Sequence, residues 1–299
     1  MVNRVIIDYV ILYEKQFRIG RILRMLVSVI VPFYKGNEYM VNLFQMLDRN
    51  NRRLGIDCLE MIIVNDSVGV EVHVPDANVS FDYRIICNEE NQGIQKSRVI
   101  GLEEAKGEYI LFLDQDDKIS DDCIRSQLDA ICENDFVVGN GYSMEPDGKE
   151  IEIFPSLKRQ NACLDKKYYY CFADPIRSVG QVMIKKDAIP KEWCTNILKN
   201  IGADDAYLWM KMLEEGKKGA INSNHIFSYT GKNVSGDYEL MKASYLEVLD
   251  YLANSSNRFE VRVARHKTLL EHGGNSIWNK IRFIDAIIMR KLYYRLYWK

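Results

Sequence analysis

Three closely spaced aspartates, Asp114, Asp116 and Asp117, follow a short apolar segment at residues 109–113. An apolar run of this length, bounded by polar residues, predicts a strand buried on both faces. Asp114 and Asp116 lie two residues apart, so their side chains can leave the strand end on the same side. Crowded carboxylates repel one another, and Mg²⁺ or Mn²⁺ relieves the repulsion while binding phosphate oxygens. The spacing predicts a metal site for a phosphate ligand; the alternative is a solvated acidic turn before a helix cap at Ser120.

A second acidic pair, Asp204 and Asp205, stands at the start of a predicted helix over residues 203–215. The helix dipole favours the ionised form of carboxylates at this end. A carboxylate has a reference pKa of about 4, so it accepts an alcohol proton only as the attacking oxygen gains positive character. Its use as a base therefore depends on position more than on a shifted pKa. The alternative is that these residues only cap the helix.

The elements that must position these carboxylates alternate between strand and helix. The predicted strands cover residues 27–31, 59–64, 83–87 and 109–113, and the predicted helices between them cover residues 39–47 and 95–105. Such alternation favours an α/β fold with a mostly parallel sheet and helices on both faces. Ligands of open α/β sheets bind beyond the carboxyl ends of the strands, where Asp66 and Asp114 are expected. The pattern is looser over residues 135–230, and residues 236–299 are expected to be helical.

Composition narrows the class of protein. Of 299 residues, 47% are hydrophobic and 27% are charged, as in an ordinary folded domain. The formal net charge is −2, so nucleic acid is not expected as a partner. Seven cysteines form no CxxC pair, which indicates reduced thiols in a cytoplasmic protein. No apolar run is long enough to span a bilayer, and residues 1–24 lack the cleavage site of a signal peptide.

Several motifs occur together and in order along the first half of the chain. They are SVIVPFY at residues 28–34, IVNDS at 63–67, NQGIQKSR at 91–98, AKGEYI at 105–110 and LDQDD at 113–117. This set resembles the nucleotide-binding half of the family 2 glycosyltransferases of GT-A fold. The resemblance extends over residues 26–235. It implies a GT-A domain at residues 25–235, with a nucleotide-binding half at 25–117 and an acceptor half at 118–235, between an N-terminal extension at 1–24 and a C-terminal helical region at 236–299.

The resemblance also implies roles for individual residues. Pro32, Tyr34 and Asp66 match positions that line the nucleoside pocket, and Arg98 matches a basic position beneath the diphosphate site. Asp114 and Asp116 match the DXD motif, whose Mg²⁺ or Mn²⁺ holds the diphosphate. Asp205 matches the catalytic base and Asp204 the acid that precedes it, and His225 matches a third metal ligand of some relatives. Two departures affect the nucleotide loop: Lys35 replaces the common Asn, and Ser67-Val68 replaces Gly-Ser.

The implied function is inverting transfer of one sugar from a nucleotide-diphosphate donor, expected to be UDP-linked, to an acceptor hydroxyl. The Gln-x-x-Arg-Trp sequence of processive relatives does not occur, which favours addition of a single sugar. Capsule, lipopolysaccharide or exopolysaccharide assembly is the expected setting. The alternatives are a non-catalytic carbohydrate-binding or scaffold protein derived from such an enzyme, and a nucleotidyltransferase. The presence of Asp66, Asp114, Asp116 and Asp205 together favours the enzyme.

The C-terminal tail, residues 275–299, is both basic and aromatic. It carries six cations against a single acid, Asp285, with tyrosines, tryptophans and isoleucines interleaved. Cations beside amphipathic aromatic residues favour a helix that lies on an anionic lipid surface. The tail therefore predicts peripheral contact at the inner face of the cytoplasmic membrane and a glycan or lipid-linked acceptor. The alternative is a helix packed on the catalytic domain with a solvated basic face.

Overall fold

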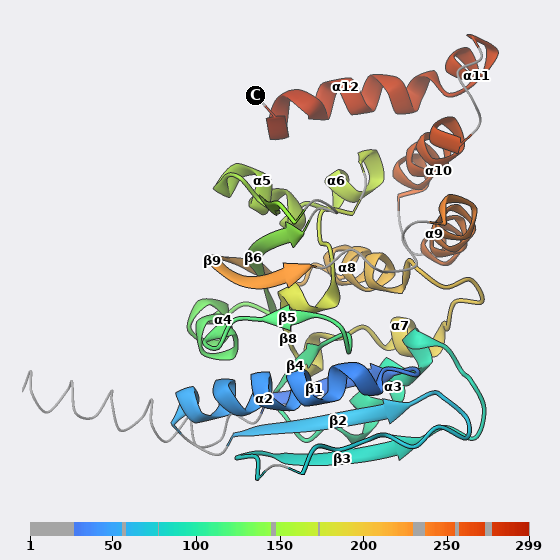
Figure 1. Cartoon of the computed structure of the whole chain (residues 1–299). Helices are drawn as coiled ribbons and strands as arrows, with labels where there is room; N and C mark the ends of the chain where they lie inside the picture. The colour runs from blue at the N-terminus through green and yellow to red at the C-terminus, as the bar shows by residue number, and fades with distance from the viewer. Residues whose placement is uncertain are drawn as a thin grey trace, which may run out of the picture.

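The computed structural model describes residues 27–55, 58–76, 78–144, 148–172, 174–229, 237–254, 257–272 and 277–298. The predicted extension at residues 1–24 lies outside this part of the chain. In the described residues, the strands form one nine-stranded sheet, and helices pack on both of its faces (Figure 1). The α/β class predicted from the sequence is confirmed.

The first half of the sheet is parallel. Strands β1 (Val27–Phe33), β2 (Leu59–Asn65), β3 (Asp82–Cys87) and β4 (Tyr109–Phe112) lie in the order β3-β2-β1-β4. All three pairs in this half are parallel, with Ile30 opposite both Ile62 and Phe112. Parallel pairing brings the carboxyl ends of these strands to one edge of the sheet, so the segments that follow β1, β2 and β4 come together there.

The second half of the sheet is mixed. Beyond β4 the order continues through β8 (Val182–Lys185), β6 (Phe136–Met144), β9 (Gly219–Tyr229) and β5 (Lys118–Ile119), while β7 (Glu150–Glu152) pairs with β6. The pairs β4–β8, β8–β6, β6–β7 and β9–β5 are antiparallel, and only β6–β9 is parallel. The mostly parallel sheet predicted from the sequence thus describes the first half of the sheet, not the whole of it.

Helices cover the two faces with separate cores. Alternate strand residues such as Val29 and Leu111 pack with α2 (Asn37–Leu54) and α4 (Cys123–Ile131). Their neighbours Ile30 and Phe112 pack on the other face with α3 (Ile94–Glu104), α7 (Lys191–Thr195), α8 (Asp204–Glu214) and α9 (Tyr238–Leu252). The period of two along each strand therefore places consecutive residues in different cores.

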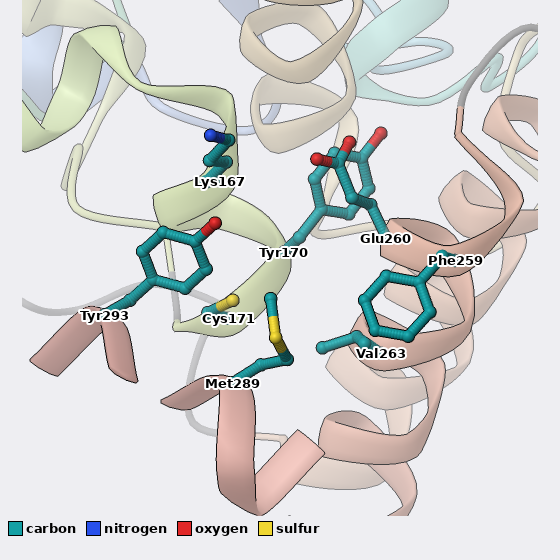
Figure 2. A pocket seen from close by; sticks show the side chains of 8 residues that line it. All are labelled: Lys167, Tyr170, Cys171, Phe259, Glu260, Val263, Met289 and Tyr293. Atoms are coloured by element: carbon teal, nitrogen blue, oxygen red, sulfur yellow. The ribbon is translucent and has the colours of Figure 1, made fainter. Parts of the chain in front are cut away.

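The C-terminal region is helical, as predicted. After α9 come α10 (Arg258–His272), α11 (Ile277–Arg282) and α12 (Ile284–Trp298), coloured orange to red in Figure 1. With α6 (Lys166–Cys171), helices α10 and α12 form a third apolar cluster that includes Phe172, Val263 and Tyr297. A pocket of only ≈ 10 Å³ remains where the three helices meet, lined by residues such as Tyr170 and Met289 (Figure 2). Such a volume holds about one water molecule, so the contact between α6, α10 and α12 leaves no room for a larger ligand.

Smaller elements complete the chain. The helix α5 (Leu157–Asn161) and three single turns of 3₁₀-helix (Ala162–Leu164, Val179–Gln181 and Lys186–Ala188) connect the strands of the second half. No disulfide links the seven cysteines, all of which the structure describes. Among the described helices, none has both the length and the apolar character that a bilayer span requires.

Candidate active site

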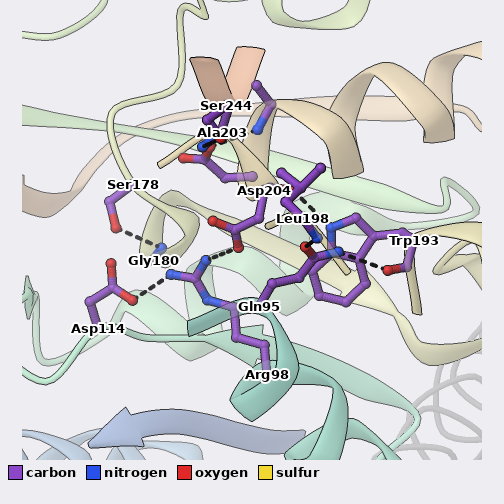
Figure 3. A network of polar contacts seen from close by, with 12 residues as sticks. Gln95, Arg98, Asp114, Ser178, Gly180, Trp193, Leu198, Ala203, Asp204 and Ser244 are labelled. Atoms are coloured by element: carbon purple, nitrogen blue, oxygen red, sulfur yellow. Dashed lines mark hydrogen bonds and ion pairs between the residues drawn. The ribbon is translucent and has the colours of Figure 1, made fainter. Parts of the chain in front are cut away.

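The guanidinium of Arg98 joins the two acidic clusters singled out in the sequence. Its Nη2 donates to Asp114 Oδ1 at 2.6 Å, and its Nη1 donates to Asp204 Oδ2 at 2.5 Å (Figure 3). The side chains of Arg98 and Asp204 are 3% and 6% exposed, and that of Asp114 is 18% exposed. Burial alone would lower the pKa of Arg98, but Asp114 and Asp204 raise it above its ordinary value. Arg98 is therefore a fixed positive charge between two carboxylates.

Three elements bring this bridge together. Arg98 lies in the middle of α3, Asp114 lies in the turn that follows β4, and Asp204 is the first residue of α8. Helix α3 packs closely on the sheet at Gly101. A side-chain carbon at this position would overlap Ile30 of β1. The glycine thus allows the close approach of α3 that carries Arg98 to the strand ends.

The start of α8 does not use its acids as caps. Ala203 is the N-cap residue, and no side chain makes a capping hydrogen bond there. Asp204 turns to Arg98 instead, while Asp205 Oδ1 accepts from the neighbouring backbone N–H of Ala206 at 2.7 Å. Burial, and then the charge of Asp204, raise the pKa of Asp205 to about 7. A carboxyl with this pKa can exchange a proton near neutral pH.

The aspartates after β4 have different surroundings. Asp114 and Asp116 are partly exposed, whereas Asp117 is buried and accepts a hydrogen bond from Ser178 Oγ. Burial first, and then the charge of Asp114, raise the pKa of Asp117 well above its ordinary value. Gly180 lies against this carboxyl, because an added Cβ there would stand 3.1 Å from Asp117 Oδ2. Asp117 therefore helps to hold the turn, whereas Asp114 and Asp116 remain partly exposed.

The predicted nucleoside residues lie at the ends of β1 and β2. Pro32 is buried in β1, and the Tyr34 side chain beyond it is 50% exposed. The side-chain amide of Gln115 pairs with the backbone of Tyr34, with two hydrogen bonds of 3.1 Å. Lys35 has a left-handed φ of 50°, and its N–H donates to Ser67 Oγ at 2.7 Å. Lys35 and Ser67, which belong to the two departures from the family pattern, thus contact each other.

Asp66 holds the loop that leads into α3. Its Oδ1 accepts from Asn88 Nδ2 and from the N–H of Gln92, and its Oδ2 accepts from the N–H of Gly93, each at 2.8 Å. Gly93 has φ 84°, which favours glycine. The carboxylate is 5% exposed. Asp66 therefore fixes the entry to the helix that carries Arg98.

A cleft of ≈ 220 Å³ opens beside this loop. It lies between residues 91–95 on one side and residues 197–201 on the other, and Asp204 contributes to its lining. The sequence did not predict that residues 197–201 form a wall of this cleft. It also did not single out Gln95, whose side chain connects the two walls. One signal was present: Gln95 precedes Arg98 by three residues and so shares its face of α3. Residues 197–201 show no pattern that points to a cleft.

His225 lies apart from the aspartates after β4. Its Nε2 contacts Glu152 Oε1 at 2.7 Å, and its ring stacks on Tyr142 with 4.6 Å between centroids. The structure does not bring His225 together with Asp114 and Asp116, and no three His, Cys, Asp or Glu side chains in the described ranges are grouped to hold a metal.

Comparison with known proteins identifies the family. The family model described as "Glycosyl transferase family 2" matches residues 28–193, which is more than half of the chain. The chain therefore belongs to glycosyltransferase family 2. A curated relative from Bacillus subtilis, a putative teichuronic acid biosynthesis glycosyltransferase, is 30% identical over 200 residues, which cover 64% of this chain and 73% of the relative. An uncharacterised glycosyltransferase of Haemophilus influenzae is 25% identical over 212 residues, which cover 68% and 78%.

Solved structures show the same fold at low identity. TarS of S. aureus, residues 1–349 in complex with UDP-GlcNAc, aligns with a TM-score of 0.57 at 16% identity over 88% of this chain and 79% of that one. A mannosyltransferase from Pyrobaculum calidifontis in complex with GDP-Man and Mn²⁺ aligns with a TM-score of 0.56 at 13% identity, over 91% and 76%. The GT-A fold predicted from the motifs is confirmed.

Proposed function

We propose that this chain is a metal-dependent, inverting glycosyltransferase that moves one sugar from a UDP-linked donor to an acceptor hydroxyl. The observation that carries the proposal is the Arg98 bridge. It ties Asp114, matched to the diphosphate site, to Asp204, whose neighbour Asp205 has a pKa raised to about 7. A group that leaves as a diphosphate and a group that accepts a proton are both required for this reaction, and the bridge holds their candidates together.

Asp114 and Asp116 fit a cation that arrives with the donor. Mg²⁺ and Mn²⁺ commonly take one or two carboxylates, with phosphate oxygens and water as the other ligands, so a group of three protein ligands is not needed. Asp114 and Asp116 are partly exposed, and Arg98 already occupies Asp114 Oδ1. A bound cation would supply positive charge to the departing diphosphate. Arg98 adds a second positive charge next to Asp114.

The remaining steps belong to residues of the chain. Asp205 accepts the proton of the acceptor hydroxyl as that oxygen forms its bond to the anomeric carbon. The bond from the anomeric carbon to the diphosphate oxygen breaks, and UDP leaves with the electron pair. Attack from the side opposite the diphosphate inverts the anomeric centre. Tyr34 offers an exposed ring to the nucleobase, next to Pro32 and Asp66.

The donor and the setting are proposed from the relatives. Structural neighbours are described with UDP, UDP-GlcNAc or GDP-Man, and UDP is favoured because TarS carries it. Relatives named for teichuronic acid and minor teichoic acid biosynthesis favour a role in building a cell-surface polymer such as capsule, lipopolysaccharide or exopolysaccharide. The acceptor is then a growing glycan or a lipid-linked sugar.

Release of UDP from a panel of nucleotide sugars tests the function. With Mn²⁺ the wild type should turn over at least one UDP-sugar, and EDTA should stop it. Asp205→Asn should lose more than about 99% of turnover while UDP binding stays within about twofold. Asp129→Asn, at an exposed position of α4, is the matched control and should keep wild-type turnover. Sugar binding without turnover would support the scaffold alternative, and release of pyrophosphate from a nucleoside triphosphate would support a nucleotidyltransferase.

We further propose that α11 and α12 lie on an anionic membrane at the cytoplasmic face. Their outer side is apolar although it faces solvent. The exposed residues are Ile277 (70%), Ile281 (58%), Ile284 (54%), Ile288 (50%), Leu292 (60%) and Leu296 (58%). Exposed cations, among them Lys280, Lys291 and Arg295, lie between them. The inner side of α12, with Ala286 and Tyr297, is buried against the domain, so the helix is docked on one side and unpartnered on the other.

Vesicle flotation tests the membrane proposal. The wild type should float with vesicles that contain phosphatidylglycerol and lose binding in high salt. Ile288→Glu with Leu292→Glu should reduce binding about tenfold or more, because each introduces a charge on the apolar side. Val41→Glu, an equally exposed apolar position on α2, is the control and should bind as the wild type does. Equal flotation of all three proteins, or none for the wild type at low salt, would refute this contact.

A further inference from the structure

The loop between α7 and α8 leads directly into Asp204 and Asp205 at the start of α8 and also forms one wall of the cleft. It covers residues 196–203 and ends at Asp204. Its backbone is held by side chains of helix α9, in the C-terminal region, beyond the residues matched by the family model. We propose that Glu247 and Ser244 of α9 are positioning residues for the transfer reaction. The proposal rests on the function proposed above, in which Asp205 accepts the proton.

Glu247 binds the middle of the loop with both carboxylate oxygens. Its Oε1 accepts from the N–H of Lys199 at 2.8 Å, and its Oε2 accepts from the N–H and the side-chain amide of Asn200 at 3.0 and 2.8 Å. Burial opposes the charge, but these three donors lower the pKa of Glu247 below its ordinary value. Charged acceptors make the stronger hydrogen bonds to backbone amides, so the carboxylate is well suited to hold this loop.

Ser244 binds the end of the loop, one helical turn earlier on α9. Its hydroxyl donates to the carbonyl of Asn200 at 2.9 Å and accepts from the N–H of Ala203 at 3.0 Å. Figure 3 draws Ser244 beside Ala203, and both residues are buried. Ala203 is the N-cap of α8, so Ser244 fixes the residue directly before Asp204. Between these contacts Gly202 has φ 117°, and a Cβ there would stand 2.5 Å from Met241 Sδ of α9.

Helix α3 holds the same loop from the opposite side. Gln95 Oε1 accepts from the N–H of Leu198 at 2.9 Å, and its Nε2 donates to the carbonyls of Trp193 and Asn196 at 2.9 and 3.2 Å. Gln95 lies one turn before Arg98 on α3. The same helix therefore binds the loop through Gln95 and pairs with Asp204 through Arg98. The loop is therefore clamped between α3 and α9, so a shift of the start of α8 at Asp204 would break these bonds.

The clamp is tested by two variants of α9 with one matched control. Glu247→Gln keeps the shape but replaces one acceptor oxygen by a donor that faces a backbone N–H. Ser244→Ala removes both bonds to the loop end. Glu239→Gln is the control, because Glu239 lies on the same helix, is 77% exposed and pairs with Lys242 on the surface of α9. All three variants are compared with the wild type by thermal unfolding, hydrogen exchange and turnover of the active nucleotide sugar.

Hydrogen exchange tests the clamp without any substrate. In Glu247→Gln and Ser244→Ala, the amides of residues 198–203 should exchange about tenfold faster, while those of the sheet stay protected. Their kcat should fall about tenfold, with binding of UDP and Mn²⁺ within about twofold, because only the proton acceptor is misplaced. The control should match the wild type in both measurements.

Two results would overturn the proposal. Unchanged exchange over residues 198–203 in both variants would show that α9 does not hold the loop. Faster exchange with unchanged kcat would show that the contacts from α9 to the loop do not position Asp205 for the reaction. A wild type inactive with every nucleotide sugar would refute the proposed function instead, and the exchange data alone would then decide whether the clamp exists. If Glu247→Gln does not fold, Ser244→Ala carries the same comparison.

Discussion

Arg98 Nη1 lies 2.5 Å from Asp204 Oδ2, across 106 residues of sequence. The two side chains are almost wholly buried, and the second amino group of Arg98 reaches Asp114. The bridge means that the end of β4 and the start of α8 cannot move independently. A planar guanidinium suits this task because it presents donors in two directions, whereas an ammonium is a single point charge.

Removal of the guanidinium should destabilise the fold. Arg98→Met leaves Asp204 buried without its partner, and such a loss typically costs about 3–5 kcal/mol of the free energy of unfolding. Arg98→Lys should recover only part of this, because one ammonium cannot bridge two carboxylates in the same way. Chemical denaturation measures both values. Arg52→Met is the control, since that exposed side chain pairs on the surface of α2 with Asp48 and should cost about 1 kcal/mol or less. Equal losses for Arg98→Met and Arg52→Met would contradict the prediction.

The rate of transfer should depend on pH through Asp205. Its pKa is raised to about 7 by burial and by the charge of Asp204, and only the ionised carboxylate accepts a proton. Below pH 7 the value of kcat/KM should therefore fall about tenfold per pH unit, and above it the value should level off. Initial rates over roughly pH 5–9 measure this. A profile that stays flat down to pH 5 would mean that another group accepts the proton.

The strands and helices of the first half could be predicted because their signals are local. Apolar runs and helical periodicity placed β2, β3 and α3 within about one residue at each end. Two elements differ by more: α2, predicted over residues 39–47, covers Asn37–Leu54, and β1, predicted to stop before Pro32, extends to Phe33. Ile30 O accepts from Leu113 N on the β4 side, so Pro32, two residues on, also faces β4. The ladder to β4 ends at Ile30, and no partner there requires the missing N–H.

The rest of the site depends on contacts between distant segments. The motifs assigned Asp114 and Arg98 to one predicted domain, but nothing in the sequence pairs Arg98 with Asp204 or Glu247 with the loop before α8. The mixed half of the sheet is also non-local, since β8 pairs between β4 and β6. Register between distant strands follows from packing of the whole chain, which local periodicity does not contain.

A single methyl group should disturb the second half of the sheet. A Cβ at Gly141 of β6 would overlap the backbone carbonyl of Phe227 in β9, at the irregular pairing beside Asn140. Backbone cannot yield as a flexible side chain does, so Gly141→Ala should cost about 1–3 kcal/mol or more of the free energy of unfolding. Ser143→Ala, on the same strand, is the control and should cost less than about 1 kcal/mol. Equal midpoints of denaturation for the two variants would refute this reading of the contact.

The stability of the fold should also depend on pH through the raised pKa of Asp205. The free energy of unfolding should fall as pH rises, whereas the rate of transfer should rise. The folded protein holds this proton up to about pH 7, whereas the unfolded chain releases it near the ordinary value of 3.8. The contribution of the protonated form is complete below pH 3.8 and is lost as pH rises through 7, because the unfolded state then gains from ionisation. Asp205→Asn does not titrate, so its Tm should exceed that of the wild type by an amount that grows from pH 4 to 7 and then stays constant. Thermal unfolding of both proteins over this range measures the difference, and a Tm difference that shrinks with pH would show that Asp205 is stabilised as a carboxylate.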